Sequence, residues 1–417
     1  YLGWFGYGVS VTLGSQIVGE RVTIRDSHDS GLFIYGDDSI VDLSDLLIED
    51  THVSGGQGGG FGIYAIEDSQ VFVDRGKIQR SAREALYVAD SYTQLQDVVI
   101  EDTGFGLDFT DPEMSEEELD TFGGSGKAIV GLDGAYISGV RVVAKRDKTA
   151  GVMLSGPGTM GIFSDLSISD VETGGIEESG QGIVVTDGAR IEAERAKIDM
   201  TRDAGVWLQG EGTTGVMSNV YITRSKRDYV TAERGNGIHV TGKAKIDLTV
   251  GKIDMSDGSG VVAMGEGSRI SLEEILIVGK RDLQAGSVEE VESVESVESV
   301  ESVEMGEDGL AVVHGAHVSV TRGVIMQSAR AGVLISDDES LGMGSVAELQ
   351  EVQVVENNIG FCFNSETFSV ENSFSEVSSE NNEVESSVEA VEVQPQGAVE
   401  SSMASVELSA AQTNRQQ

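Results

Sequence analysis

One short motif recurs along the whole chain: a small residue, an apolar residue, any residue, and a second apolar residue. It starts at Gly8, Gly31, Gly62, Ala85, Ala128, Gly151, Gly182, Gly205, Gly237, Gly260, Gly309, Gly332 and Gly360. Every second interval between these starts is 23 residues, and the intervals between are the same length with residues added. Self-similarity at a fixed period indicates a repeat architecture, in which each unit stacks on its neighbours.

Within a repeat the apolar residues alternate with period two, which is typical of strands. In residues 182–204, Ile183 and Val184 face opposite sides, an Asp-Gly turn follows, and further alternations begin near Ile191 and Ile198. Three short strands joined by three turns fit a triangular coil of roughly 22–25 residues.

Comparison between repeats supports stacked coils. An isoleucine lies 16 residues after the motif start in most of the shorter repeats, at Ile24, Ile78, Ile198, Ile253 and Ile325. Stacking places like above like, so we expect aliphatic columns inside a rod about 60 Å long. Parallel connections are nearly always right-handed. The sequence therefore predicts an all-β fold, a right-handed parallel β-helix of about 13 three-stranded coils.

The added residues are interpreted as loops inserted at one corner of alternate coils. We expect all of them to protrude from the same edge of the rod. The predicted loops are Gly55–Gly60, Asp111–Gly126, Thr173–Gly180, Lys226–Asn236, Arg281–Asp308 and Gln353–Asn358.

Two segments have low complexity. Residues 287–304 lie inside one predicted loop and repeat a Ser-Val-Glu tripeptide. This period of three matches neither a strand nor a helix. Residues 386–417 are predicted to be a disordered, acidic, serine-rich tail, which leaves 1–385 for the β-helix. Because the first residues already resemble the interior of a repeat, we expect a truncated amino terminus whose signal peptide, if any, is not present.

Charge and composition narrow the class of protein. The net charge is −43 and there is one cysteine, Cys362. Such a chain repels nucleic acid and anionic membranes. It has no apolar run long enough for a membrane span and no internal disulfide. We expect an extracellular or bacterial cell-surface protein without a cofactor.

The chain resembles the pectin-lyase-like family of right-handed β-helices over roughly residues 1–385. The resemblance rests on segments such as GIVVTDGARIEAERAKIDMTRDAG and VVENNIGFCF. The family includes polysaccharide lyases, hydrolases, epimerases, adhesins and surface proteins. In its enzymes a groove on one face of the helix binds polysaccharide, so the resemblance implies a glycan-related role without specifying an activity.

Signals of catalysis are weak. Gly36-Asp37-Asp38-Ser39 is similar to one polygalacturonase signature, but the family's other signatures are missing. The same coil position carries Asp or Gly in many repeats, which favours a turn role. His314 and His317 lack a third zinc ligand at a defined spacing, and no serine-nucleophile motif occurs. We expect no metal site beyond weak, diffuse calcium binding.

A Lys-Arg-Asp run recurs near the loop corner. It begins at Lys145, Lys226 and Lys280. Local charge balance explains it in so acidic a protein. The alternative is a strip that contacts an anion such as a uronate polymer, since the arginine guanidinium group can donate two hydrogen bonds to one carboxylate.

The outward position of the first strand, two residues after each motif start, gives the main functional hint. This outer column is Ser10, Phe33, Tyr64, Tyr87, Val130, Met153, Val184, Trp207, His239, Val262, Ala311, Leu334 and Cys362. An outer column exposed to solvent should be polar, and this one is apolar and aromatic. Either sugar rings stack along it, or the neighbouring loops fold over it and bury it. The candidate ligand-binding residues are Phe33, Tyr64, Tyr87, Met153, Trp207 and His239.

These observations favour a non-catalytic extracellular scaffold that binds a glycan or a protein through the outer face of its first strand and the adjacent loops. The alternative is a polysaccharide lyase or glycoside hydrolase acting on an acidic polysaccharide. Carboxylates converging with Arg or Lys on the Phe33–His239 face would favour that alternative.

Overall fold

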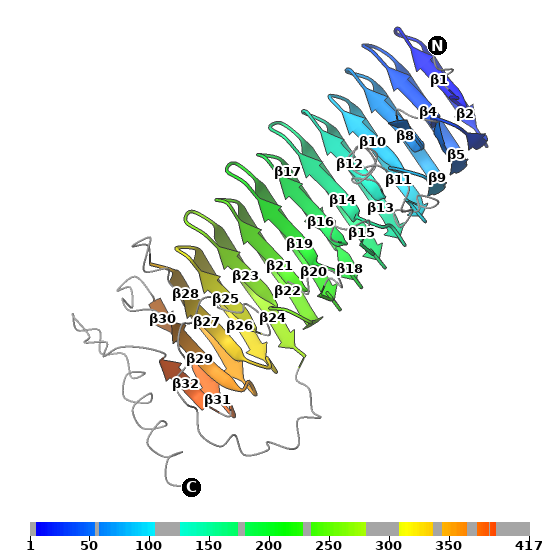
Figure 1. The fold of residues 1–417 in the computed structure, drawn as a ribbon. Helices are drawn as coiled ribbons and strands as arrows, with labels where there is room; N and C mark the ends of the chain where they lie inside the picture. The colour runs from blue at the N-terminus through cyan, green and yellow to red at the C-terminus, as the bar shows by residue number, and fades with distance from the viewer. Residues whose placement is uncertain are drawn as a thin grey trace, which may run out of the picture.

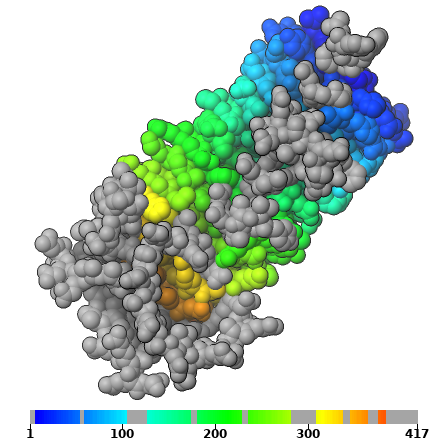
Figure 2. Space-filling view, in the orientation of Figure 1, coloured from blue at the N-terminus to red at the C-terminus, as the bar shows by residue number. Residues whose placement is uncertain are grey.

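The structure is a computed structural model that describes residues 6–54, 58–104, 126–173, 180–227, 235–280, 308–336, 344–364, 373–382 and 384–388. The chain forms a long rod in which the strands stack from one end to the other (Figure 1). Colour runs steadily along the rod, so residues close in sequence lie at neighbouring levels (Figure 2). The fold is an all-β, right-handed parallel β-helix, as predicted.

Two large parallel sheets build the rod. The 14-stranded sheet consists, in spatial order, of β1 (Val9–Thr12), β4 (Ser30–Tyr35), β8 (Phe61–Ile66), β10 (Leu86–Ala89), β12 (Lys127–Leu132), β14 (Ala150–Ser155), β16 (Gln181–Thr186), β19 (Ala204–Gln209), β21 (Asn236–Thr241), β23 (Val261–Met264), β25 (Leu310–Val313), β27 (Ala331–Ser336), β29 (Ile359–Asn364) and β32 (Val384–Val388).

The 16-stranded sheet carries the rest of each coil. Its main path is β2 (Gln16–Glu20), β5 (Ile40–Thr51), β9 (Gln70–Ser81), β11 (Tyr92–Glu101), β13 (Tyr136–Lys145), β15 (Met160–Ser169), β17 (Arg190–Glu194), β20 (Thr214–Thr223), β22 (Lys245–Ser256), β24 (Arg269–Gly279), β26 (His317–Met326), β28 (Val346–Val355) and β30 (Ser373–Ser375), with β3 (Thr23–Ser27), β18 (Lys197–Asp199) and β31 (Ser378–Glu380) paired beside it. A separate antiparallel pair joins β6 (Val53–Ser54) and β7 (Gly58–Gly59).

Each coil passes once through the 14-stranded sheet and then through the 16-stranded sheet. The predicted second and third strands are usually one long strand, such as β5, that bends at a single residue. At that bend Asp45 has a φ of 54°, in the left-handed region. In other coils the bend separates two strands, as between β17 and β18. The corner between the predicted second and third strands is therefore made by a single residue, which a period-two pattern does not reveal.

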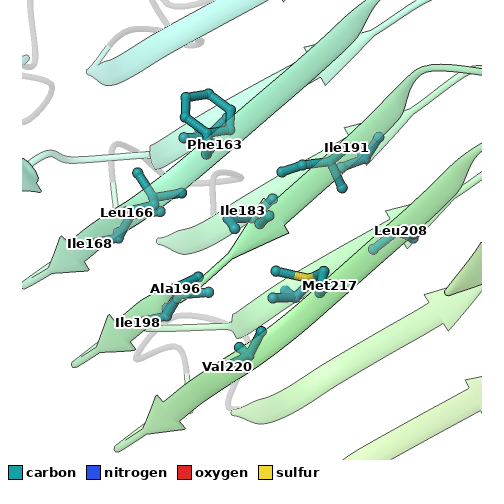
Figure 3. Close-up of a cluster of buried hydrophobic side chains, with 14 of the residues drawn as sticks. Phe163, Leu166, Ile168, Ile183, Ile191, Ala196, Ile198, Leu208, Met217 and Val220 are labelled. Carbon is teal, nitrogen blue, oxygen red and sulfur yellow. The ribbon is translucent and has the colours of Figure 1, made fainter. Parts of the chain in front are cut away.

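Aliphatic side chains fill the interior in columns, as the sequence predicts. The residues opposite Ile198 on its two neighbouring strands are Ile168 and Ile222, and all three are fully buried. Phe163 and Ile191 pack nearby in the same core (Figure 3). The core is continuous from Val11 to Phe363, which is how a solenoid gains stability from nearest-neighbour packing.

The small residues that start the motif also form a column, because no larger side chain fits. A Cβ atom added at Gly205 would lie 2.4 Å from Cγ2 of Ile222 and 2.7 Å from the carbonyl oxygen of Gly237. Gly237 meets Ile253 and Gly260 in the same way. The interior isoleucine column therefore requires a minimal side chain at this corner.

The turn after the first strand has a structural role for its acidic residues. Asp38, Asp90, Asp133 and Asp187 all adopt left-handed φ angles, which Asp tolerates better than most residues. In alternate coils a buried hydroxyl ties this turn to its neighbour. Thr213 Oγ1 donates to the Gln209 carbonyl at 2.8 Å and accepts from the Gly188 N–H at 2.9 Å.

In the chain, five of the six predicted insertions fall between a strand of the 16-stranded sheet and the next strand of the 14-stranded sheet, and most of their residues lie outside the described residues. The sixth prediction, Gln353–Asn358, is wrong, because Gln353 lies within β28 and pairs with Val324 and Ser378. That coil takes its extra length at the first corner, between β27 and β28.

The ends and the repeats of low complexity are only partly described. Strand β32 extends to Val388 and pairs with β29, so the β-helix continues slightly beyond the predicted boundary at 385. The rest of the predicted tail and the 287–304 segment lie outside the described residues. Within the described chain no helix is long and apolar enough to cross a membrane.

Candidate functional site

The predicted outer column is a true column in the structure. Each of its members is directly opposite the next in the parallel register, from Ser10 and Phe33 on β1 and β4 to Leu334 and Cys362 on β27 and β29. The six candidate ligand-binding residues therefore lie on one line along the 14-stranded sheet.

Exposure divides this column into two parts. Phe33, Tyr64, Tyr87, Met153 and Trp207 are half-buried. From His239 onward every member is buried, and Val262, Ala311, Leu334 and Cys362 belong to a second hydrophobic cluster outside the main core. The column is thus buried from His239 onward, and the aromatic rings before that point are partly exposed.

Four rings near the amino terminus form a continuous stack, which we call the aromatic stack: Tyr7, Phe33, Tyr64 and Tyr87. Successive ring centroids are 4.4, 5.8 and 4.9 Å apart, with interplanar angles of 8°, 13° and 29°. These distances are close to the spacing between strands, roughly 4.8 Å. The rings are therefore offset-stacked on one another along the rod axis.

This geometry changes how a ligand could be bound. Rings stacked at these distances cover each other's faces, so a sugar that lies along the column cannot stack face to face between two of them. The stack offers ring edges and phenol oxygens instead. At its end Tyr87 is followed in the column by the smaller Val130, and within the described chain no aromatic ring stacks on that side.

Phe61 joins the aromatic stack to a charged group. Its ring is 4.6 Å from that of Tyr64 and 5.5 Å from that of Tyr87, and only 8% of the residue is exposed. The guanidinium carbon of Arg83 lies 5.0 Å from the Phe61 centroid, within the range of a cation–π contact. Arg83 Nε is also 3.5 Å from Oε2 of Glu84.

Two carboxyl groups beside the stack are shifted toward the neutral form. Burial raises the pKa of Glu84, and the positive charges of Arg83 and Lys127 oppose the shift only in part. Burial likewise raises the pKa of Asp29, although a hydrogen bond with Tyr7 opposes it. Neither carboxyl was among the predicted site residues.

The phenols of the stack are also held in their neutral form. Burial, followed by the charge of Asp29, raises the pKa of Tyr7 to about 12. Burial, followed by the neighbouring Tyr64 and Glu84, raises the pKa of Tyr87 to about 12. The site therefore combines hydroxyl donors, one guanidinium group and two carboxyls whose pKa values are raised, on a protein that is otherwise strongly acidic.

Sequence reasoning missed Tyr7, Phe61, Arg83 and Glu84 because it followed the second residue after each motif start. The contacts of Phe61 with Tyr64 show that the position directly before the motif start also faces outward. That position holds Tyr7, Ser30, Phe61, Glu84 and Lys127 in the first coils. Comparison of this position between repeats would have found the charged and aromatic partners.

Trp207 and His239 lie farther along the column. Their rings are 6.2 Å apart and inclined by 59°, so they are not stacked face to face. His239 is buried, with Nδ1 3.1 Å from Nδ2 of Asn236. Val130 and Val184, which separate this pair from the aromatic stack, are only 4% and 7% exposed.

The remaining sequence signals are accounted for locally. The Lys-Arg-Asp runs do not share one register: Lys145 bonds Glu101, whereas Lys280 bonds Asp257. Among the described residues no group of three or more His, Cys, Asp or Glu side chains could hold a metal ion. Cys362, the single cysteine of the sequence, is buried.

Comparison with known proteins returns likeness of fold only. No protein-family model matches the chain, and no curated protein matches it. A mutant of the periplasmic alginate epimerase AlgG is similar at a TM-score of 0.47 and 8% identity, over 88% of this chain and 77% of that chain. The A-module of the Azotobacter vinelandii mannuronan C-5 epimerase AlgE4 is similar at a TM-score of 0.34 and 12% identity, over 89% and 79%.

A third similar structure is the catalytic domain of a GH87 alpha-1,3-glucanase in complex with tetrasaccharides. Its TM-score is 0.41 at 10% identity, over 90% of this chain and 63% of that chain. The chain thus spans less than two thirds of the glucanase structure that it matches.

Proposed function

We propose that this protein is a non-catalytic extracellular β-helix that binds a carbohydrate polymer through the aromatic stack. The observation that carries the proposal is the half-buried row of Tyr64 and Tyr87 beside Phe61 and Arg83 on the outer face of the 14-stranded sheet. Ring edges and phenol hydroxyls give apolar contact and hydrogen bonds together, which suits hydroxyl-rich sugars.

The dimensions favour a polymer. From Tyr7 to Tyr87 the stack passes through three coil steps, about 14 Å in all. A contact surface of that length spans several sugar residues, so a monosaccharide would use only part of it. Polymers of this kind are encountered outside the cell, which is why the proposal includes an extracellular or cell-surface location.

The experiment is a direct titration of a panel of neutral and uronic polysaccharides against the wild-type protein, Tyr64→Ala and Tyr87→Ala. Loss of either ring removes edge contacts and a hydroxyl, and we expect affinity to fall roughly tenfold or more, about 1.4 kcal/mol. Tyr87→Phe keeps the ring and isolates the hydroxyl contribution.

The chain supplies a matched control. Tyr92 and Tyr136 stack at 5.2 Å and 6° on the 16-stranded sheet, away from the proposed site. Tyr92→Ala should leave binding unchanged. A panel without binding, or equal losses from Tyr92→Ala and Tyr87→Ala, contradicts the proposal.

A second candidate function is a polysaccharide lyase or hydrolase. The observation that favours it is the pair of carboxyls with raised pKa, Asp29 and Glu84, near Arg83 and neutral tyrosines, because a protonated carboxyl can serve as a general acid. Glu84, however, is only 5% exposed. Release of reducing ends or unsaturated products, abolished by Glu84→Gln, would establish this candidate in place of the first.

A further inference from the structure

Two corners of each coil, except the third corner of the coil that contains β24, are formed by a residue in the left-handed region, and these residues align from coil to coil. The second corner column is Arg21, Asp45, Arg75, Asp97, Arg141, Asp165, Arg195, Asn219, Val250, Glu274, Arg322, Glu351 and Glu376. The third corner column is Asp26, Asp50, Arg80, Asp102, Arg146, Asp170, Met200, Arg224, Met255, Gln327, Glu356 and Asn381.

From Arg21 to Glu351 the second corner column alternates between arginine and an acid, except at Asn219 and Val250, and the acids before Asn219 lie in coils that end in an insertion. Coils that end in an insertion carry an acid or an amide there, as at Asp45, Asp97 and Asp165. The coil after each insertion usually carries arginine, as at Arg75 and Arg141. The acid and the arginine therefore face each other across the boundary that the insertion interrupts, which we call an insertion junction.

The two side chains make bidentate contacts at these junctions. Arg75 Nε and Nη2 donate to the two carboxylate oxygens of Asp45 at 2.7 and 3.3 Å. Arg195 contacts Asp165 in the same way at 2.6 and 3.1 Å. The third corner adds Arg80, whose Nε and Nη2 lie 2.6 and 2.8 Å from the two oxygens of Asp50.

The directions of the pKa shifts agree with this pairing. Hydrogen bonds from the facing arginines lower the pKa values of Asp45, Asp50, Asp97 and Asp165. The carboxylates are thus ionised and engaged over the whole neutral range, although several of them are exposed to solvent.

The number of pairs differs between junctions. The first two insertion junctions, after β5 and after β11, have a pair at both corners. The junctions after β15 and β24 have one each, at Arg195 and Arg322. The junction between β20 and β22 has no acid–arginine pair at either of its two described corners. Asn219 faces Val250 at one corner, and Arg224 faces Met255 at the other. Arg224 instead contacts Asp199 in the preceding coil, across a boundary without an insertion.

A physical reason connects the pairs with the insertions. At an ordinary boundary the continuous chain places the next coil directly above the last. Where an insertion separates two coils, aligning them costs additional loop-closure entropy. Parallel pairing by itself resists a shift in strand register only through side-chain packing. We infer that the corner acid–arginine pairs are register locks that hold successive coils in alignment where an insertion separates them.

The inference goes beyond the proposed function, and the unlocked junction provides its test. Asn219→Asp and Val250→Arg together rebuild the pair seen at Asp165 and Arg195. In the wild type, the single variants and the double variant, hydrogen exchange of the β20 and β22 amides measures opening of the junction. We expect exchange in the double variant to slow about two- to fivefold more than the single effects predict.

Two controls separate the lock from other effects. Val250→Gln removes a β-branched residue from a φ of 57° without adding a charge, so it measures relief of backbone strain alone. High salt should abolish the extra protection of the double variant, because an exposed pair is screened. Additive single effects, or protection that persists in high salt, would overturn the inference.

The converse experiment removes both acid–arginine pairs from one junction, the one between β11 and β13. Arg141→Gln with Arg146→Gln should increase exchange of the β11 and β13 amides, while Arg190→Gln, whose partner Glu192 lies on the same strand, should not. If the unlocked protein exchanges as slowly as the control, the pairs do not fix the register.

Discussion

Single carboxyl groups in this solenoid lie in opposite environments. Glu101 is 7% exposed, and burial raises its pKa, but hydrogen bonds from Lys145 and Lys77 outweigh that effect and lower the pKa to about 2. Asp147 is fully buried, and burial raises its pKa to about 8. Its Oδ1 accepts the Thr103 N–H at 3.3 Å, while Oδ2 has no hydrogen-bond partner among the described residues.

Asp147 should make stability depend on pH. Because its pKa is raised in the folded state, its contribution is full below pH 4 and is lost as the pH rises through about 8. The Asp147→Asn variant should not show this loss. We expect its free energy of unfolding to equal that of the wild type near pH 4 and to exceed it by roughly 2–5 kcal/mol at pH 8.5. Urea unfolding of the wild type and the variant between pH 4 and pH 8.5 measures this difference. Asp38→Asn, at an exposed left-handed turn, is the control, and parallel pH curves for both variants would contradict the assignment.

At the level of strands, the register depends on matched columns of large and minimal side chains. The interior isoleucines occupy the space that a side chain at the motif start would need. Alanine stands at two starts, Ala85 and Ala128, so a methyl group is the largest side chain found at the described starts. Interior packing of this density tolerates little added volume.

Gly205→Val should therefore be strongly destabilising. The new Cβ atom alone would lie 2.4 Å from Ile222, and two further methyl groups must also be placed. We expect a loss of about 3 kcal/mol or more in the free energy of unfolding. Thr186→Val, on the outward side of β16, should change stability by less than about 0.5 kcal/mol. Equal effects of the two changes would contradict the packing argument.

The strand register could be predicted residue by residue from the sequence. The recurring motif aligns one coil with the next, and the period-two alternation assigns each side chain to the inner or outer face. The sequence predicted the line formed by Phe33, Tyr64 and Tyr87 for the same reason. It did not predict the one-residue corners, since a left-handed Asp or Arg reads as an ordinary polar residue of a strand. The insertion in the β27–β28 coil was misplaced because loop and turn residues have similar compositions there.

Other features depend on packing that no single repeat contains. The contact of Phe61 with Arg83 joins adjacent coils at a position without a repeated composition. The division of the outer column between half-buried tyrosines and a buried second cluster likewise follows from its surroundings rather than from residue type.

At the scale of the whole molecule, the coils stack into a long rod (Figure 1), and the 14-stranded sheet carries a line of partly exposed rings. Solenoids of this kind supply extended binding surfaces because each coil adds one position to a line. Here the line contains aromatic rings near its start and at Trp207 and the buried His239, and the rings stack continuously only near its start, so ligand contact is expected at the first coils.

The most direct test is a crystal structure of the protein soaked with an oligosaccharide from the polymer that binds best in titration. The account predicts sugar density along the outer edges of Tyr64 and Tyr87, with polar contacts from Arg83 or the phenol hydroxyls. Density confined to the Tyr92–Tyr136 face, or no ordered sugar beside the aromatic stack at saturating concentration, would contradict it.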